Sequence, residues 1–393
     1  MSTIDYSHDS RVVLTLDAGG TNFRFSAVRA NKPITQTLTV PSFGNDLNSC
    51  LFTIVEGFAR VKNLYSITPV AISFAFPGPA DYPNGIIGDL PNLPGFRGGI
   101  ALGPMLEEKF GIPVFINNDG DLFTYGEAIA GFLPYVNTLL EKAGSPKRYK
   151  NLLGVTLGTG FGGGIVRDGE LFLGDNSMAG EIWLLRNKIY PLMNAEESVS
   201  IRAVRRTYAQ LMNIPLNEAP DPAEIQQFAF GAEPDKRNAA IEAYRQLGEV
   251  AGDAIGNALT LIDGLAVIGG GISKAYQLFL PTLVDQLNSS YIVPQERVLR
   301  RLASVAFNLE DEAQLKTFLE GDLREVKVPG SFRKIKYDPL QRIGIGISRL
   351  GTSEAIAIGA YAFALNKLTD ESFLLPAYTE NNSTGTTIKN DEK

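Results

Sequence analysis

The sequence predicts an α/β protein that contains one structural unit twice. In the first copy, an apolar run at residues 12–17 ends in a glycine turn, and residues 23–28 alternate as a second strand. Residues 152–166 repeat the order of strand, glycine turn and strand about 140 residues later. Strands alternate with helices through the rest of the chain, which predicts sheets with helices on both faces.

The other expected elements follow the two copies in chain order. In the first half they are a buried strand at 70–76, an amphipathic helix at 100–110 and a short strand at 113–117. In the second half they are a long helix at 238–262, a strand at 264–271, a helix at 273–287, a strand at 342–348 and a buried helix at 353–365. Residues 134–150, 212–237 and 306–340 have less regular patterns, and we expect surface insertions there.

The composition is that of a globular protein long enough to bury a large core. Its 393 residues are 44% hydrophobic, which favours two domains over one. The net charge is −7, and no run of five Lys or Arg residues offers a footprint for nucleic acid. No stretch has the pattern of a signal peptide or of a membrane span, which needs ~18 apolar residues. We therefore expect a cytoplasmic protein without nucleic-acid or membrane partners, and a disordered tail at 380–393.

The chain has one cysteine, Cys50, and one histidine, His8. These counts exclude a disulfide framework and a structural zinc site of Cys and His ligands, because such a site needs about four of them. A serine–histidine triad is also disfavoured, since His8 lies in a polar terminus. We interpret Cys50 as a small buried hydrophobic residue.

Residues Gly158, Gly160 and Gly163 satisfy the G-x-G-x-x-G pattern of a dinucleotide-binding loop. Such a loop must open a helix, whose N-terminus then receives the pyrophosphate. Here the chain turns back as a hairpin at Asp168-Gly169 instead, which argues against NAD. A Walker-type phosphate loop is absent from the sequence as well.

Glycine-rich hairpin turns can nevertheless bind phosphate, because their free backbone N–H groups form a concave anion site. Two such turns facing each other would hold a polyphosphate from both sides. Asp17, at the end of the first strand, is placed to hold Mg²⁺, a cation that prefers one or two carboxylates. The simpler interpretation, that these are only tight turns, is weakened by a third glycine cluster at residues 269–271.

Two polar residues, Asn118 and Asp119, separate the strand at 113–117 from a helix-like segment. Either could be an N-cap, which accepts a hydrogen bond from the first helical turn and contributes about 1 kcal/mol. Asp119 could also be a general base that takes the proton from a hydroxyl as it attacks a γ-phosphate. The two roles can coexist on adjacent residues.

Six ordered segments carry a resemblance to a known family. They are LDAGGTNFRFSAV, FAFPGPADYPNGII, PNLPGF, NNDGDLFTYGEA, GVTLGTGFGGGIVRDGELFLGDNSMAGEI and VIGGGIS. With these segments, the sequence resembles the ROK family of sugar kinases and sugar-responsive repressors from residue 12 to about residue 365. Six motifs in the family's order are a specific signal, unlike any one of them.

The resemblance implies an actin-like (ribonuclease H-like) ATPase fold, with two lobes that close over ATP-Mg²⁺ and a hexose in an interlobe cleft. It implies a small lobe at residues 1–118, completed by a C-terminal helix near 366–379, a large lobe at 119–365, and a homodimer. The residues implied to meet the phosphates are Asp17, Gly19, Gly20, Thr21, Asn22, Gly158, Thr159 and Gly160. Gly269, Gly270 and Gly271 are implied to lie by the adenosine.

The resemblance also assigns the sugar side of the site. It makes Asp119 the catalytic base, with Asn118 and Glu181 as ligands of sugar hydroxyls. Carboxylate and amide groups suit this role because they hydrogen-bond sugar hydroxyls. A sugar that lacks the matching hydroxyl leaves a buried polar group without a partner and is discriminated against. A later sugar-binding glutamate of the family aligns with Glu196, although Glu197 is an alternative.

This chain departs from the family after Glu181. Family members commonly continue as G-E-I-G-H and then supply a cysteine-rich zinc segment, whereas residues 180–188 are GEIWLLRNK and no zinc cysteines follow. We therefore expect no structural zinc, and a loop held by packing of Trp183, Leu184 and Leu185. Trp183 is expected in the core, with stacking on a sugar as the alternative. The substitution leaves open which hexose is bound.

Arg24 is interpreted as a charge beside the cleft, paired with an acid; direct contact with phosphate is the alternative.

The function that these assignments predict is an ATP-dependent, glucokinase-like hexose kinase that acts on a sugar hydroxyl, with the hydroxyl on C6 as the expected acceptor. A repressor is disfavoured, because the first glycine motif begins at residue 17 and leaves no room for a helix-turn-helix ahead of it. A sugar-sensing protein without catalysis is the remaining alternative.

Overall fold

The computed structural model describes residues 5–78, 80–90, 93–294 and 297–369. Its first sheet has the order β3-β2-β1-β5-β9, with β4 paired to β2. Strand β1 is antiparallel to β2 and parallel to β5, which is in turn parallel to β9. The strands are β1 (Val13–Ala18), β2 (Asn22–Arg29), β3 (Lys32–Pro33), β4 (Leu38–Pro41), β5 (Ala71–Ala75) and β9 (Val114–Asn117).

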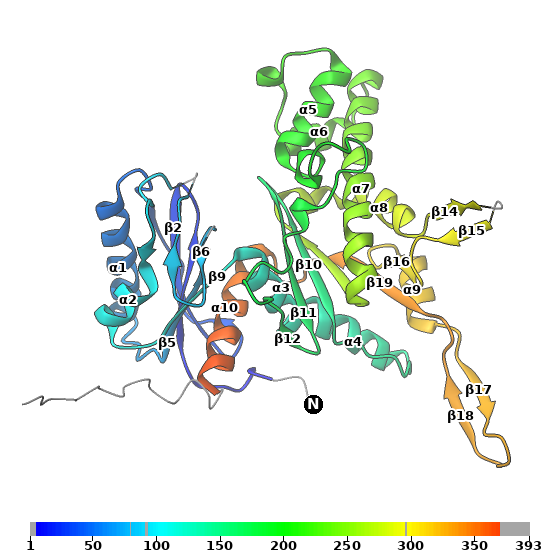
Figure 1. Ribbon diagram of the computed structural model, residues 1–393, viewed down its shortest axis with the longest axis horizontal. Helices are drawn as coiled ribbons and strands as arrows, with labels where there is room; N and C mark the ends of the chain where they lie inside the picture. Colours follow the sequence, from blue (N-terminus) through cyan, green and yellow to red (C-terminus); the bar gives the residue numbers. More distant parts are fainter. Residues whose placement is uncertain (1–4, 79, 91–92, 295–296, 370–393) are drawn as a thin grey trace, which may run out of the picture.

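Two helices, α1 (Leu47–Leu64) and α2 (Leu102–Phe110), cover the outer face of this sheet (Figure 1). Their apolar side chains pack with those of the sheet in one core cluster, in which Cys50 is buried as expected. Beside them lies a small three-stranded sheet of β6 (Ala80–Asp81), β7 (Ile86–Ile87) and β8 (Ile100–Ala101). Helix α1 was missing from the sequence prediction.

The second sheet repeats the local pattern of the first. Its order is β12-β11-β10-β13-β19-β16, with β10 antiparallel to β11 and parallel to β13. The pairing of β10 thus matches that of β1, which confirms the duplicated unit. The strands are β10 (Leu152–Leu157), β11 (Phe161–Arg167), β12 (Glu170–Leu171), β13 (Leu265–Gly269), β16 (Val305–Asn308) and β19 (Arg342–Ile347).

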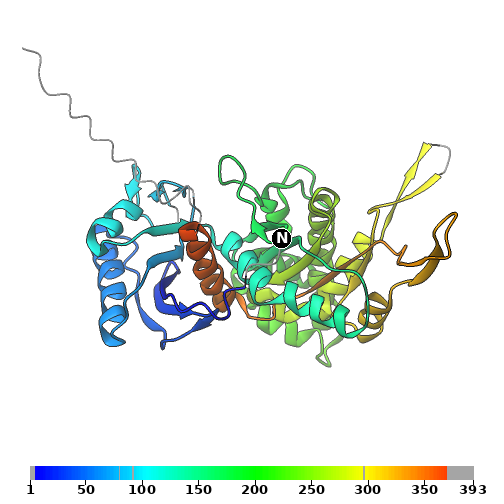
Figure 2. The same cartoon turned by 90° about the horizontal axis from the view of Figure 1, so that it is seen from below.

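Helices cover both faces of the second sheet (Figures 1 and 2). On one face lie α5 (Ile201–Met212), α6 (Pro222–Phe228), α7 (Pro234–Ile262) and α8 (Tyr276–Leu287), which share a core cluster with β10 and β13. On the other face lie α3 (Asp119–Ile129), α4 (Phe132–Lys142) and α10 (Thr352–Thr369). This second cluster includes side chains of both sheets, so α3 and α10 join the two lobes.

Helix α10 also packs on β1 and β5 of the first sheet. The lobe boundary at residue 118 stays a prediction. Of the C-terminal helix expected near 366–379, residues 370–379 lie outside the described part of the chain, as does the tail at 380–393.

The three stretches with less regular patterns, where surface insertions were expected, contain regular helices and strands. Residues 134–150 contain most of α4, whose period was disguised by Pro134 in the first helical turn, where proline is tolerated. Residues 212–237 contain α6 and the start of α7. Residues 306–340 contain most of β16, an edge strand of the second sheet too short to show an alternating pattern, and helix α9 (Glu312–Glu320).

Two hairpins extend from the far end of the second lobe (Figures 1 and 2). They are β14 (Ser290–Val293) with β15 (Arg297–Arg300), and β17 (Arg324–Lys327) with β18 (Lys334–Tyr337). None of the helices in the described ranges is both long and apolar enough to cross a membrane.

Candidate functional site

A cleft of about 520 Å³ opens between the two lobes. It collects residues from the ends of β1 and β5, the start of α3, the β10–β11 turn, the segment after β12 and the start of α10. Most of the predicted site residues are among those that line it: Asp17, Asn118, Asp119, Gly158, Thr159, Gly160, Glu181, Glu196 and Gly270. The other predicted residues are not part of the lining: Gly19, Gly269 and Gly271 are adjacent in sequence to lining residues, and Gly20, Thr21 and Asn22 lie further along the β1–β2 turn.

The first glycine turn connects β1 to β2 through a tight backbone bond, in which the Gly19 N–H donates to the Asn22 carbonyl at 3.1 Å. Asp17 stands at the end of β1 with its carboxylate partly exposed. Its Oδ2 is 3.4 Å from Nη1 of Arg24 and accepts a hydrogen bond from Oγ of Ser353 at 3.2 Å. Arg24 is therefore paired with an acid, as expected.

The second glycine turn leads into a strand, not a helix. Gly158 N–H donates to the Gly160 carbonyl at 3.0 Å, and β11 then runs antiparallel to β10. This hairpin confirms the argument against a dinucleotide loop. A Cβ atom at Gly160 would lie 2.6 Å from Oε2 of Glu196, so glycine lets the two approach closely.

The third glycine cluster meets the second. Gly270 follows β13 with φ +88°, and a Cβ atom there would lie 2.2 Å from the Leu157 carbonyl oxygen. Only glycine fits this left-handed position without strain. The Gly270 N–H donates to Oγ1 of Thr352 at 2.9 Å, which joins the cluster to the start of α10.

Asn118 is the N-cap of α3, and Asp119 is its first residue. The Gly120 N–H donates to Oδ1 of Asn118 at 2.8 Å and to Oδ1 of Asp119 at 2.9 Å. A Cβ atom at Gly120 would lie 2.4 Å from the Gly163 carbonyl oxygen, so this glycine lets the helix start press against β11. The N-cap interpretation of Asn118 is thereby confirmed, and Asp119 lines the cleft.

Asp119 is solvent-exposed, and its carboxyl lies at the cleft among other protein groups that partly desolvate it. This desolvation raises its pKa above the usual value, against the hydrogen bond from Gly120, which lowers it. The charges of Asp17 and Glu181 act in the same direction as desolvation. A carboxylate whose pKa is raised in a cleft is a better proton acceptor, as a general base requires.

Glu181 begins a short 3₁₀ turn, η1 (Ile182–Leu184), that packs against β11. Its Oε2 accepts a hydrogen bond from Nε1 of Trp183. Trp183 is half-buried: its ring packs against the second-lobe core and also lines the cleft. Leu184 is 58% exposed, so the expectation that it holds the loop by packing was wrong; Leu185 does pack on the core.

Glu196 lies in η2 (Ala195–Ser198) and lines the cleft, whereas Glu197 does not. Oε2 of Glu196 accepts from the Phe161 N–H at 3.1 Å, and its Oε1 pairs with Nη2 of Arg202 at 2.7 Å. Glu197 faces Arg202 and Arg206, whose hydrogen bonds lower its pKa. The geometry therefore favours Glu196 over Glu197 as the cleft residue.

A model of the ROK family matches residues 13–313. The chain belongs to the ROK family. A solved glucokinase from Parabacteroides distasonis is 54% identical with a TM-score of 0.83, and the match covers 92% of this chain and 99% of that one. A glucokinase from Thermotoga maritima is 25% identical over 297 residues, which span 72% of this chain and 88% of its own.

A ROK family glucokinase from Streptomyces griseus, solved with glucose and AMPPNP, shares 18% identity with a TM-score of 0.58 over 89% of this chain and 98% of its own. Likeness at that level shows the fold alone. These solved ROK structures confirm the duplicated, two-lobed, actin-like α/β fold expected from the sequence.

In this ROK chain the side-chain amide of Asn187 holds the loop after Glu181 through four hydrogen bonds. Asn187 is fully buried, and its Oδ1 accepts from the backbone N–H groups of Ile189 and Tyr190, both at 3.0 Å. Its Nδ2 donates to the Asn194 carbonyl at 3.1 Å and to Oγ of Ser198 at 2.8 Å. Within the described ranges no group of three or more His, Cys, Asp or Glu side chains could hold a metal ion.

Sequence reasoning missed two residues at the start of α10 that complete the site. Thr352 lines the cleft, and Ser353 bonds Asp17 of the other lobe. A hydroxyl pair before a buried apolar helix is a signal of a helix start, and it could have marked this segment. Its meeting with Asp17 joins residues 336 positions apart, which no local pattern records.

Proposed function

We propose that this protein is an ATP-dependent hexose kinase that transfers the γ-phosphoryl group to a sugar hydroxyl, with the hydroxyl on C6 as acceptor. The observation that carries the proposal is the position of Asp119. Its carboxylate lies in one cleft with the glycine turns and with Glu181 and Glu196. A hydroxyl and a polyphosphate bound to these two groups of residues would meet at Asp119.

In the proposed mechanism the chain mainly positions the reactants. Backbone N–H groups of Thr159 and Gly160 in the β10–β11 turn hold phosphate oxygens, while Asn118, Glu181 and Glu196 hold sugar hydroxyls. Asp119 accepts the proton of the attacking hydroxyl on its carboxylate. The relatives support a sugar as the acceptor substrate. They include glucokinases and N-acetyl-D-glucosamine kinases, one of the latter from Vibrio cholerae at 31% identity over 170 residues.

Asp17 fits a Mg²⁺ ion that accompanies the nucleotide. It offers a partly exposed carboxylate at the cleft, held by Arg24 and Ser353, which matches the few protein oxygens that hydrated Mg²⁺ needs. Bound there, the ion would neutralise charge that develops on the transferred phosphoryl group. We also propose that the enzyme acts in the cytoplasm, where ATP is available, and as a homodimer.

The direct test is ADP release by the full-length protein across a panel of hexoses. The panel contains glucose, mannose, fructose, N-acetylglucosamine and N-acetylmannosamine, with ATP, GTP or polyphosphate as donor. We expect hexose-dependent ADP release, equal in amount to sugar phosphate formed, and none from the 6-deoxy form of the best sugar.

Two results would count against the proposal. Saturable sugar binding without ADP release would favour a sensing protein, and turnover of the 6-deoxy sugar would move the acceptor hydroxyl away from C6.

A further inference from the structure

The cleft between the lobes is rich in negative charge. Four carboxylates line it, those of Asp17, Asp119, Glu181 and Glu196, and no Lys or Arg is among the described residues of the lining. A nucleoside triphosphate would bring several more negative charges into the same space. Because like charges repel at short range, positive side chains just outside the lining decide how well a phosphate chain is held.

Two arginines lie just outside the lining, and each pairs with one of its carboxylates. Arg24 pairs with Asp17 on the first lobe at 3.4 Å. Arg202, in the first turn of α5 on the second lobe, pairs with Glu196 through its Nη2 at 2.7 Å. Each lobe therefore places one guanidinium beside the cleft.

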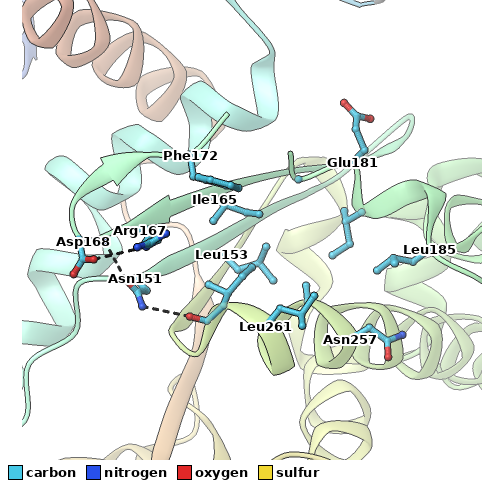
Figure 3. A pocket seen from close by; sticks show the side chains of 14 residues that line it. Asn151, Leu153, Ile165, Arg167, Asp168, Phe172, Glu181, Leu185, Asn257 and Leu261 are labelled. Atoms are coloured by element: carbon cyan, nitrogen blue, oxygen red, sulfur yellow. Dashed lines mark hydrogen bonds and ion pairs between the residues drawn. The ribbon is translucent and has the colours of Figure 1, made fainter. Parts of the chain in front are cut away.

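Glu181, the other carboxylate of the proposed sugar side, forms no ion pair within the described ranges. It stands at one end of an apolar groove of about 620 Å³ beside the cleft (Figure 3). The arginine of that groove, Arg167, lies at the opposite end and pairs with Asp168 at 3.8 Å. Of the two glutamates in the described part of the cleft, Glu196 is thus the one held by a cation.

Arg202 also reaches the turn that is proposed to hold phosphate. Its Nη1 donates to the Thr159 carbonyl at 3.5 Å, which is a long and weak hydrogen bond. Helix α5 is fastened to the same turn, because the Ile201 N–H donates to the Gly158 carbonyl at 2.8 Å. The Arg202 side chain is 47% exposed, so Nη1 lies beside the turn with donor capacity that a ligand can use.

A role limited to stabilising the fold does not account for this position. Ion pairs between half-exposed side chains contribute little to stability, and Arg202 is such a case. Glu197, which Arg202 also contacts at 2.7 Å, has a second partner in Arg206. The place of Arg202 at the β10–β11 turn points instead to an anionic ligand.

We propose that Arg202 binds the phosphate chain of the nucleotide through Nη1 while its Nη2 keeps Glu196 in place, and so links the nucleotide side of the cleft to the sugar side. Arginine suits this task because its planar guanidinium presents several donors in a rigid fork, whereas a lysine ammonium is a single point charge. The inference rests on the proposed kinase function and names a further residue that binds its nucleotide.

The first test measures the binding of AMPPNP and of adenosine to the full-length protein by titration calorimetry, with Mg²⁺ present. We expect Arg202→Met to weaken AMPPNP binding about tenfold or more, because a hydrogen bond between two charged groups is lost. Adenosine has no phosphate, so its affinity should stay the same. The melting temperature should also change little.

Arg206→Met is the matched control for this measurement. Arg206 lies one turn further along the same helix, and its ion pair within the described ranges is with Glu197 alone. This variant should bind AMPPNP as wild type does.

The second test measures hexose affinity with and without AMPPNP. Wild type should bind its best hexose more tightly when AMPPNP is present, and this gain should be lost in Arg202→Met, because the link between the two sides is broken. Arg202→Lys should recover part of the AMPPNP affinity but not the gain, since one ammonium cannot hold both partners.

Three results would overturn the role of Arg202: unchanged AMPPNP affinity in Arg202→Met, a loss of affinity that adenosine shares, or a gain in hexose affinity that survives the substitution. Wild-type protein that binds no AMPPNP would instead count against the kinase function on which the inference rests.

Discussion

Trp183 and Glu181 illustrate what a single hydrogen bond can do at this site. The apolar run around Trp183 indicated a core position, and the ring does pack on the core. Its N–H group, however, donates to the Glu181 carboxylate at the cleft. The sequence could not show this contact, because it depends on the 3₁₀ turn that brings two residues so close in sequence face to face.

We expect Trp183→Phe to raise the KM for the hexose about 10-fold to 100-fold, because a hydrogen bond to a charged group is worth roughly 1.5–3 kcal/mol. The KM for ATP and the melting temperature should change little, since Phe preserves most of the packing. Steady-state kinetics with each substrate varied in turn measures this. An unchanged KM for the hexose would show that the contact does not position Glu181.

A second residue-scale prediction concerns Asp121, which is buried and has an Oδ1 atom without a hydrogen-bond partner. Burial raises its pKa well above the usual value, and the charges of Glu181 and Asp119 add to this. The folded state therefore holds a proton that the unfolded chain releases above about pH 4, so this residue makes folding less favourable as pH rises.

Asp121→Asn cannot ionise, and we expect it to stabilise the protein at pH 8 by about 1 kcal/mol or more. The gain should shrink as pH falls toward 5. Urea unfolding of both proteins at pH 5, 6.5 and 8 gives the comparison. A gain that grows toward low pH would contradict the sign of the pKa shift.

At the scale of elements, strand β19 begins with a buried charged residue, Arg342, whose role the apolar alternation of the strand does not indicate. The Arg342 side chain is fully buried; its Nε donates to the Phe318 carbonyl at 2.6 Å, and its Nη1 pairs with Asp338 at 2.5 Å. The strand was predicted correctly, but its first residue connects it to α9, which the sequence prediction missed.

We expect Arg342→Met to lower the free energy of unfolding by about 3–5 kcal/mol, because it leaves the Asp338 carboxylate buried and unpaired. Adding Asp338→Leu should recover much of that loss. The matched control is Arg245→Met: its pairs with Glu242 and Glu249 are partly exposed to solvent, and their loss should cost about 1 kcal/mol or less. Equal losses in the two single variants, measured by denaturant unfolding, would refute the argument from burial.

The elements also show how far local pattern carries a prediction. The two glycine hairpins could be predicted from the sequence, because few residue types other than glycine fit such tight turns. Helix α1 was missed because its buried face includes Cys50 and Gly57 among the larger apolar residues, which weakens the helical period. Asp119 and Glu181 could be predicted because they lie in motifs, and Glu196 because it aligns with a glutamate of the family, whereas Ser353 reaches the site only through the tertiary fold.

For the whole molecule, the central feature is the pair of helices between the sheets. Helices α3 and α10 approach so closely that a Cβ atom at Gly126 or Gly359 would lie 1.9 Å from a backbone carbonyl oxygen of the other helix. Glu127 ties this pair to the loop before α10, accepting from Oγ of Ser348 at 2.5 Å and from the Leu350 N–H at 3.2 Å. Both helices begin at the cleft, where the positive ends of their dipoles favour phosphate.

This arrangement gives Asp119 its proposed role, since α3 carries it to the point where the lobes meet. The measurement that tests this most directly is ADP release by Asp119→Asn with the best hexose under saturating ATP. Asp235→Asn, in the first turn of α7, is the control. We expect Asp119→Asn to lower kcat by about 10²-fold to 10⁴-fold or more, with hexose affinity and melting temperature nearly unchanged. A variant that keeps near-normal turnover would contradict it.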